Sequence, residues 1–188
     1  MAPHKSWHHR GYLPHLDSGA TVQFVTFRLA DSLPREVYEA CVAAARDRIE
    51  LHGRLEAMID AGRGACLLRD AGNAGNAAIV RTALEHFDGE RYRLIAWVIM
   101  PNHVHALVEQ VEGWRLGDVV RSWKTYAAKA INARRSGSGI VWAKDYFDRF
   151  IRDEAHFLNT VRYIEENPVK AGLAVQPSDW PFSSAAER

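Results

Sequence analysis

Two histidines separated by a single valine are the residues of this sequence best placed to do chemistry. His103 and His105 lie in Trp97–Glu109, where apolar residues predict strands. Because successive side chains of a strand point to opposite faces, the two imidazoles share one face, with their roots about 6–7 Å apart. At this spacing both ring nitrogens can bind one metal ion. A pair of satisfied core histidines is the simpler alternative, but burying two polar rings without a partner is costly, which favours a metal site.

A third ligand and a nucleophile are expected on a helix near the end of the chain. Tyr163 and Asn167 are four residues apart and therefore lie on one helix face. The Asn167 amide oxygen is a candidate third ligand, with Glu166 as its rival, and the Tyr163 hydroxyl would lie beside the ion as the nucleophile. A tyrosine on an amphipathic helix is also typical of a core or interface position. The other tyrosines considered, Tyr126 and Tyr146, are followed four residues later by no plausible ligand.

Alternating and helical hydrophobic patterns predict the elements that position these residues. A single helix is expected from the cap at Asp31 to about Ala61, a loop over 62–76, and a final helix that Pro168 ends at Asn167. After Pro168 we expect an irregular tail. The remaining expected elements are strands at Thr21–Leu29, Tyr92–Met100, His103–Glu109 and Tyr146–Ile151, and helices at Ala77–Phe87, Leu116–Arg134 and Glu154–Glu166.

Positive charge gathers on the helix expected at Leu116–Arg134. The basic residues from 115 to 135 are Arg115, Arg121, Lys124, Lys129, Arg134 and Arg135, and Asp118 is the one acidic residue among them. Solvated helix faces usually carry both signs, so this excess favours a polyanionic partner. Residues 1–20 mix histidines, aromatic residues and Arg10, a composition that suits stacking on unpaired bases and equally a frayed terminus.

Global composition describes an ordinary single-domain protein. The 188 residues are 47% hydrophobic and carry a formal net charge of +1, so only local charge indicates a nucleic-acid partner. The cysteines, Cys41 and Cys66, are too few for a disulfide framework, and a reducing cytoplasm is the expected compartment. The first residues lack the apolar core of a signal peptide and no apolar run is long enough to span a membrane.

Several ordered motifs resemble the REP-associated tyrosine transposases, which are single-tyrosine transposases of the HUH endonuclease superfamily. The motifs that carry this resemblance are Trp97–Val108, Ser122–Lys124, Tyr146–Asp153, Tyr163–Leu173 and Asp179–Ser184. The resemblance implies an α+β fold with a ferredoxin-like βαββαβ core, an antiparallel sheet that bears the His pair, and an added C-terminal helix that carries the tyrosine. It implies one domain over residues 1–188, with residues 1–20 as a DNA-contacting or disordered arm and residues 52–88 as an insertion relative to compact members.

The resemblance also implies a reaction. His103, His105 and Asn167 would bind Mg²⁺ or Mn²⁺, and Tyr163 would nick single-stranded DNA beside an imperfect, REP-like hairpin, holding the 5′ end as a phosphotyrosine for strand transfer. We expect the ion or a nearby basic group such as Lys170 to favour the phenolate, since a free phenol has a pKa near 10. We assign DNA contacts to Arg10, Arg121, Lys124, Lys129, Arg149, Arg152 and Lys170.

Other functional classes explain the sequence less well. A catalytically inactive, transposase-derived hairpin-binding protein is the main alternative, but such a protein can lose the tyrosine or a histidine, and both are present here. A His-x-His hydrolase usually shows further Asp or His nearby, whereas Ala106 and Leu107 follow this pair. A purely structural domain explains neither the His pair nor the basic helix. The protein is expected to act as a monomer or homodimer, without a membrane.

Overall fold

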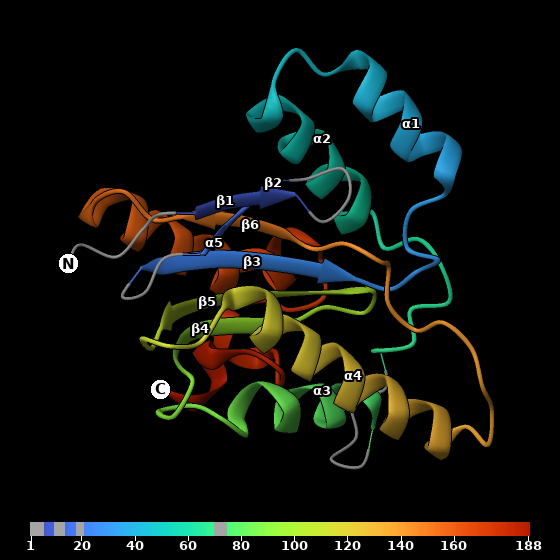
Figure 1. Cartoon of the computed structure of the whole chain (residues 1–188). Coiled ribbons are helices and arrows are strands. Elements are labelled where there is room, and N and C mark those ends of the chain that lie inside the picture. Colours follow the sequence, from blue (N-terminus) through green and yellow to red (C-terminus); the bar gives the residue numbers. More distant parts are fainter. Residues whose placement is uncertain (1–5, 10–13, 18–20, 70–74) are drawn as a thin grey trace.

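A four-stranded antiparallel sheet is the centre of the fold in a computed structural model (Figure 1), which describes residues 6–9, 14–17, 21–69 and 75–188. Its strands are β3 (Val22–Arg28), β4 (Tyr92–Ile99), β5 (His103–Gln110) and β6 (Phe147–Phe150). They lie in the order β4-β5-β3-β6, and each neighbouring pair is antiparallel. Helices connect β3 to β4 and β5 to β6, which gives the βαββαβ arrangement and confirms the predicted ferredoxin-like, α+β class.

Helices cover both faces of this sheet. Those of the described residues are α1 (Arg35–Ala44), α2 (Arg48–Asp60), α3 (Asn76–Glu85), α4 (Leu116–Arg134) and α5 (Glu154–Lys170). Helices α3 and α4 lie on one face and α5 on the other, while α1 and α2 stand beside one end of the sheet (Figure 1). The bounds predicted for α4 are confirmed, because its apolar residues recur with helical period over five turns.

Strand alternation divides the apolar side chains between two cores. Val25, Phe27 and Leu29 pack with α3 and α4, as expected for one face of the first predicted strand. Phe24 points to the opposite face and packs with Ile164 of α5. The His103 and His105 side chains belong to this second face, because Val104 and its alternating partners on β5 fill the first core. The sheet therefore separates α4 from the histidine pair.

A buried chain of polar groups ties the first core together. The Trp123 indole donates a hydrogen bond to the Tyr92 hydroxyl at 2.8 Å, and this hydroxyl donates to the Leu84 carbonyl at 2.6 Å. Buried aromatic residues with a polar end need such partners, and here each donor has one. The chain fixes α4, β4 and α3 to one another.

The long helix expected from Asp31 to Ala61 is wrong, because the chain breaks at Ala45–Asp47 into α1 and α2. Ala45 is extended, and the Asp47 carboxylate then caps α2 by accepting a hydrogen bond from the Glu50 N–H at 2.9 Å. An acidic N-cap satisfies an orphan N–H and favours the positive end of the helix dipole. The break allows α2 to run at an angle to α1 and to end near the histidine pair.

The final helix is longer than predicted. Helix α5 continues through Pro168 to Lys170, although a proline lacks the N–H that would bond four residues back. It ends at Gly172, whose φ of 68° suits glycine, and the Leu173 N–H returns to the Pro168 carbonyl at 2.8 Å. Asn167 is therefore held inside a continuous helix, one turn after Tyr163.

The segment after α5 is ordered and covers the free edge of β4. It contains the short 3₁₀ helices η1 (Pro177–Asp179) and η2 (Ser184–Glu187). The Ile99 N–H donates to the Phe182 carbonyl at 2.8 Å, and the Trp97 N–H donates to the Ser184 hydroxyl at 3.1 Å. The expectation of an irregular tail missed this edge pairing.

Near the N-terminus of the chain, β1 (Ser6–His9) pairs antiparallel with β2 (Pro14–Asp17) as a separate two-stranded sheet. Among the described residues, no helix has the length and apolar content needed to cross a lipid bilayer.

Candidate metal and nucleophile site

His103 and His105 open β5 on the sheet face that α5 covers. Each residue is 1% exposed, and the two Nε2 atoms are 3.1 Å apart. Adjacent ligands of an octahedral ion that sits about 2.1 Å from each are separated by about 3.0 Å. The two ring nitrogens thus have the separation expected of neighbouring ligands of one divalent ion.

Asn102 fixes the tautomer of His103. The Asn102 amide N–H₂ donates to the carbonyls of Ile59 at 3.0 Å and Arg63 at 3.1 Å, so its Oδ1 must be the atom facing His103. This oxygen lies 2.8 Å from His103 Nδ1, which must therefore carry the proton. The His103 Nε2 lone pair then points into the site, as a metal ligand requires.

Burial sets the protonation state of the His103 ring, and residues of β3 orient the His105 ring. Desolvation lowers the pKa of His103 to about 3, so the ring is neutral and ready for ligation at neutral pH. His105 Nδ1 lies 2.8 Å from the Thr26 hydroxyl on the neighbouring strand. The Phe24 ring stacks on the His105 ring, with a centroid distance of 5.2 Å.

Helix α5 brings the predicted nucleophile and third ligand to the same place. The Tyr163 ring centroid is 5.4 Å from that of His105. Asn167 is 2% exposed, and its Oδ1 has no hydrogen-bond partner among the described residues. A buried acceptor left without a donor is costly, and a cation would satisfy it. The rival ligand Glu166 instead pairs with Lys170 at 3.1 Å.

The protonation state of Tyr163 differs from the expectation. Burial, together with the carboxylates of Glu56 and Asp60, raises the pKa of its hydroxyl well above the ordinary value. The Lys170 ammonium lies 5.4 Å from the centroid of the Tyr163 ring and does not reverse this effect. Without a metal ion Tyr163 is thus a neutral phenol, and the prediction that Lys170 favours the phenolate is wrong for this state.

Helix α2 adds an acidic residue that the sequence analysis missed. Asp60 Oδ1 lies 3.4 Å from His103 Nε2, and potential ligand atoms of Asp60, His103 and His105 all lie within 4.8 Å of one another. Burial and the neighbouring Glu56 carboxylate raise the pKa of Asp60 to about 6. No local spacing indicates Asp60, because α2 and β5 meet only through the tertiary fold.

Together these donors fit a divalent cation. Two imidazoles, a buried amide oxygen and a carboxylate offer nitrogen and oxygen ligands without a thiolate, a set compatible with Mg²⁺ or Mn²⁺. The Tyr163 ring borders this cluster. A phosphate bound to the ion would therefore meet a hydroxyl nucleophile.

Comparison with known protein families shows which proteins this chain resembles. Residues 76–167 match the family described as transposase IS200-like, and the match includes the His pair, Tyr163 and Asn167. Residues 76–167 are therefore similar to the IS200-like transposases. The matched segment covers the sheet strands from β4 onward and the greater part of α5.

Two relatives belong to the REP-associated tyrosine transposases. The chain is 32% identical over 93 residues to the REP-associated tyrosine transposase of Escherichia coli strain K12, covering 50% of this chain and 54% of that protein. It is 27% identical over 110 residues to a putative REP-associated tyrosine transposase of Haemophilus influenzae, covering 53% of this chain and 61% of that protein. The matched region thus spans little more than half the length of these relatives. The chain is related to REP-associated tyrosine transposases.

A solved structure supports the fold. The structure of a REP-associated tyrosine transposase bound to a REP hairpin superposes with a TM-score of 0.57 and 21% identity, covering 96% of this chain and 83% of that chain. At this identity the likeness concerns the fold alone.

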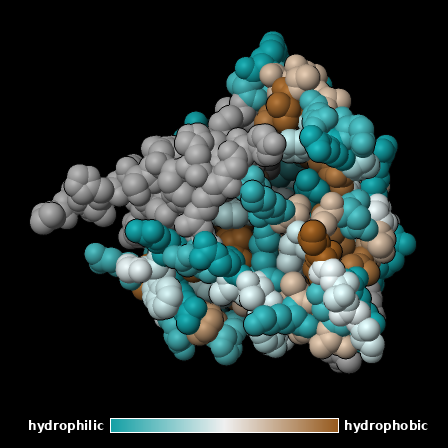
Figure 2. All heavy atoms as spheres, turned by 45° about the vertical axis from the view of Figure 1, so that its right-hand side comes forward, coloured by the Kyte–Doolittle hydropathy of each residue, from teal (hydrophilic) through white to brown (hydrophobic). Residues whose placement is uncertain are grey.

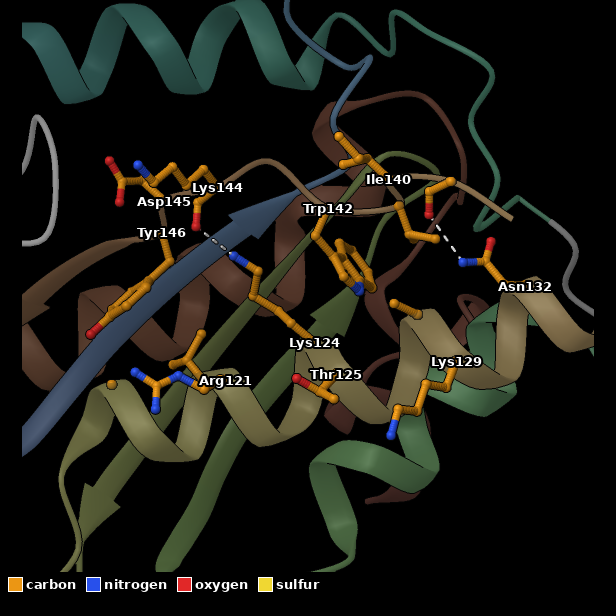
Figure 3. Close-up of a pocket in the computed structure, with 15 residues that line it drawn as sticks. Arg121, Lys124, Thr125, Lys129, Asn132, Ile140, Trp142, Lys144, Asp145 and Tyr146 are labelled. Carbon is orange, nitrogen blue, oxygen red and sulfur yellow. Dashed lines mark hydrogen bonds between the residues drawn. The ribbon is translucent and has the colours of Figure 1, made fainter. Parts of the chain in front are cut away.

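The basic residues of α4 lie on the opposite face of the sheet from the His pair. Arg121, Lys124 and Lys129 line a cavity of about 550 Å³ between α4 and residues 139–146 (Figure 3). The Lys124 ammonium donates to the carbonyls of Ala143 at 2.8 Å and Lys144 at 3.0 Å, and burial lowers its pKa to about 8. Lys124 therefore anchors the segment before β6, while Arg121 and Lys129 present exposed charge.

A second cavity shares part of its lining, including Trp142 and Lys144, with the first. It has a volume of about 730 Å³ and lies between α1 and α2 and residues 140–147, with Arg28, Tyr38 and Glu56 in its lining. On the face turned forward in Figure 2, hydrophobic side chains form separate patches among hydrophilic ones. Glu56 borders this cavity and also raises the pKa of Tyr163.

The other assigned DNA contacts are dispersed. Arg149 and Arg152 are exposed where β6 meets α5, and Arg149 Nη2 lies 2.6 Å from His156 Nε2. Lys170 is exposed at the end of α5 and pairs with Glu166. Arg10 lies outside the described residues.

Proposed function

We propose that this protein is a metal-dependent endonuclease and strand transferase that acts on single-stranded DNA through a 5′-phosphotyrosine intermediate. The carrying observation is the convergence of His103, His105, Asn167 and Tyr163 from β5 and α5 at one buried site. Tyr126, by contrast, is 51% exposed on α4, across the sheet from the His pair.

Each residue has a role that follows from its position. His103 and His105, oriented by Asn102 and Thr26, would bind the ion together with Asn167. When bound, a divalent cation supplies charge neutralisation on the scissile phosphate and favours loss of the tyrosine proton. The Tyr163 oxygen attacks phosphorus, a P–O(Tyr) bond forms, and the P–O3′ bond breaks. The 3′ oxygen leaves and takes up a proton.

The reverse step completes the reaction. A tyrosine phosphodiester keeps the energy of the bond that was cut, so a 3′-hydroxyl can attack it and release Tyr163 without an added nucleotide cofactor. The substrate class that we propose is single-stranded DNA beside an imperfect hairpin. The sequence similarity to REP-associated tyrosine transposases and the exposed basic side chains of α4 support this proposal.

A covalent-adduct assay tests the proposal. Wild-type protein incubated with a 3′-labelled hairpin oligonucleotide and Mn²⁺ should become labelled on Tyr163, as mapped by peptide mass spectrometry, whereas a 5′ label should leave with the fragment that ends in a 3′-hydroxyl. The Tyr163→Phe variant should bind the hairpin but form no adduct, and Tyr126→Phe is the matched tyrosine control that should retain it. The double variant His103→Ala/His105→Ala should also bind the hairpin without nicking.

The alternative function has a distinct result. A hairpin-binding protein without catalysis would bind the oligonucleotide and yield no adduct with any divalent ion. An adduct on another tyrosine, or nicking by Tyr163→Phe, would show that the nucleophile is misassigned. Nicking in the presence of EDTA would contradict the metal centre.

A further inference from the structure

We propose that Asp60 is a ligand of the divalent ion, so that the ion joins α2 to the sheet and to α5. This inference rests on the proposed metal centre and extends it by one residue. Asp60 precedes residues 76–167, so the family match does not include it. Its assignment depends on this chain's own geometry.

The position of Asp60 next to the His pair is built into the fold. Asn102, which sets the tautomer of His103, also donates to the carbonyls of Ile59 and Arg63. These two carbonyls bracket Asp60 in the chain. One side chain therefore orients the His103 lone pair and holds the end of α2 beside it, which brings Asp60 Oδ1 to 3.4 Å from His103 Nε2.

The chemistry of this position calls for a cation. Asp60 Oδ1 and Asn167 Oδ1 are both buried atoms without a hydrogen-bond donor among the described residues, although the Asn167 side chain also interacts with the Asp60 carboxylate. Asp60 is also the last residue of α2, where the negative end of the helix dipole disfavours a carboxylate. Ligand atoms of Asp60, His103 and His105 lie within 4.8 Å of one another, so one ion would contact all three residues.

Ligation by Asp60 changes the character of the centre. The expected set of two histidines and one amide is uncharged, whereas Asp60 adds one negative charge and raises affinity for a divalent cation. It also makes the position of α2, which borders the second cavity, dependent on the ion.

Metal titration with a charge-matched control tests this assignment. Mn²⁺ binding by the full chain is measured by calorimetry and by electron paramagnetic resonance, without DNA. Asp60→Asn should weaken binding at least about 10-fold, as loss of a metal-site partner does. Glu56→Gln removes the same charge one helical turn earlier and should change affinity far less. His103→Ala should abolish binding at this site.

The variants separate the two proposals. If Asp60→Asn and Glu56→Gln weaken Mn²⁺ binding equally, Asp60 acts only through its charge and the inference fails, while loss of binding in His103→Ala still supports the metal centre. Undiminished binding in His103→Ala would overturn the metal centre itself.

Two further measurements exclude a merely structural role. In EDTA, Asp60→Asn should unfold at the wild-type temperature or above, since it removes a buried charge, yet Mn²⁺ should raise its unfolding temperature less than that of wild type. In wild-type protein, Mn²⁺ should slow amide hydrogen exchange in the last turn of α2. Unchanged exchange there at saturating Mn²⁺ would contradict ligation by Asp60.

Discussion

Replacing Asn102 should weaken the metal site and the fold together, because this residue serves both. Asn102 is 1% exposed, and its side chain bonds to Ile59 O, Arg63 O and His103 Nδ1. Asn102→Ala removes all three hydrogen bonds, each of which contributes a net of about 0.5–1.5 kcal/mol. Water can reach the Arg63 carbonyl, so we expect the free energy of unfolding to fall by about 2–4 kcal/mol.

The metal affinity should fall for a separate reason. Without the Asn102 oxygen the His103 ring loses the partner that fixes its tautomer, and such a loss typically weakens binding by about 10–100-fold. Urea unfolding in EDTA measures the first effect, and Mn²⁺ calorimetry on the folded variant measures the second. Asn102→Asp separates the two effects, because a carboxylate still accepts the His103 N–H but cannot donate to the carbonyls of Ile59 and Arg63.

A matched asparagine provides the control. Asn132 also makes side-chain bonds in both directions, donating to Gly139 O at 3.0 Å and accepting from Arg135 at 2.9 Å, but it lies at the exposed end of α4. Asn132→Ala should leave Mn²⁺ affinity unchanged. A folded Asn102→Ala protein that binds Mn²⁺ as tightly as wild type would refute the reasoning about the His103 tautomer.

Two other substitutions test the fold around the site. The pKa of Lys124 is about 8 in the folded protein against an ordinary 10.5. Between these pH values the folded protein therefore binds fewer protons than the unfolded chain. The free energy of unfolding of the wild type should then rise with pH relative to that of Lys124→Met. Urea titrations across this range measure the difference in free energy of unfolding between the two proteins, and parallel pH profiles would contradict the prediction. Asp145 and Arg28 also act on the pKa of Lys124. Phe182→Ala should lower the free energy of unfolding by about 3–5 kcal/mol, because Phe182 is 4% exposed in the first core. Val175→Ala, at a residue 90% exposed, should change it by less than about 0.5 kcal/mol, and equal effects of the two would mean that the tail is not packed.

Local patterns predicted the elements that carry the His pair. The alternation of β5 and the helical stripe of α4 are each set by burial against the sheet, and burial leaves a periodic trace in the sequence. The Tyr163–Asn167 spacing likewise places both residues on one helix, whichever residue ends it. These features depend on neighbours within one or two turns.

The errors came from competing local rules. The break before α2 had a sequence signal that the prediction missed, since Asp47 is followed three residues later by Glu50, a pattern typical of a helix start. At Pro168 the rule against helical residues before proline predicted an end, but one missing hydrogen bond did not outweigh the packing of Ile164 and its neighbours beneath the sheet. The actual stop is Gly172, which adopts a positive φ.

Asp60 lay beyond any such rule, and its position shows how the site is assembled. The apolar stretch before His103 ends in Asn102, whose amide reaches back across the sheet end to the last turn of α2. The segment that contains Asn102 and His103 therefore also sets the distance between His103 and the Asp60 carboxylate. If the ion uses that carboxylate, then α2 responds to metal, and the cavity between α2 and residues 140–147 changes with it. The ion that favours deprotonation of Tyr163 would then also set the position of Glu56, which lines this cavity and acts on the same tyrosine.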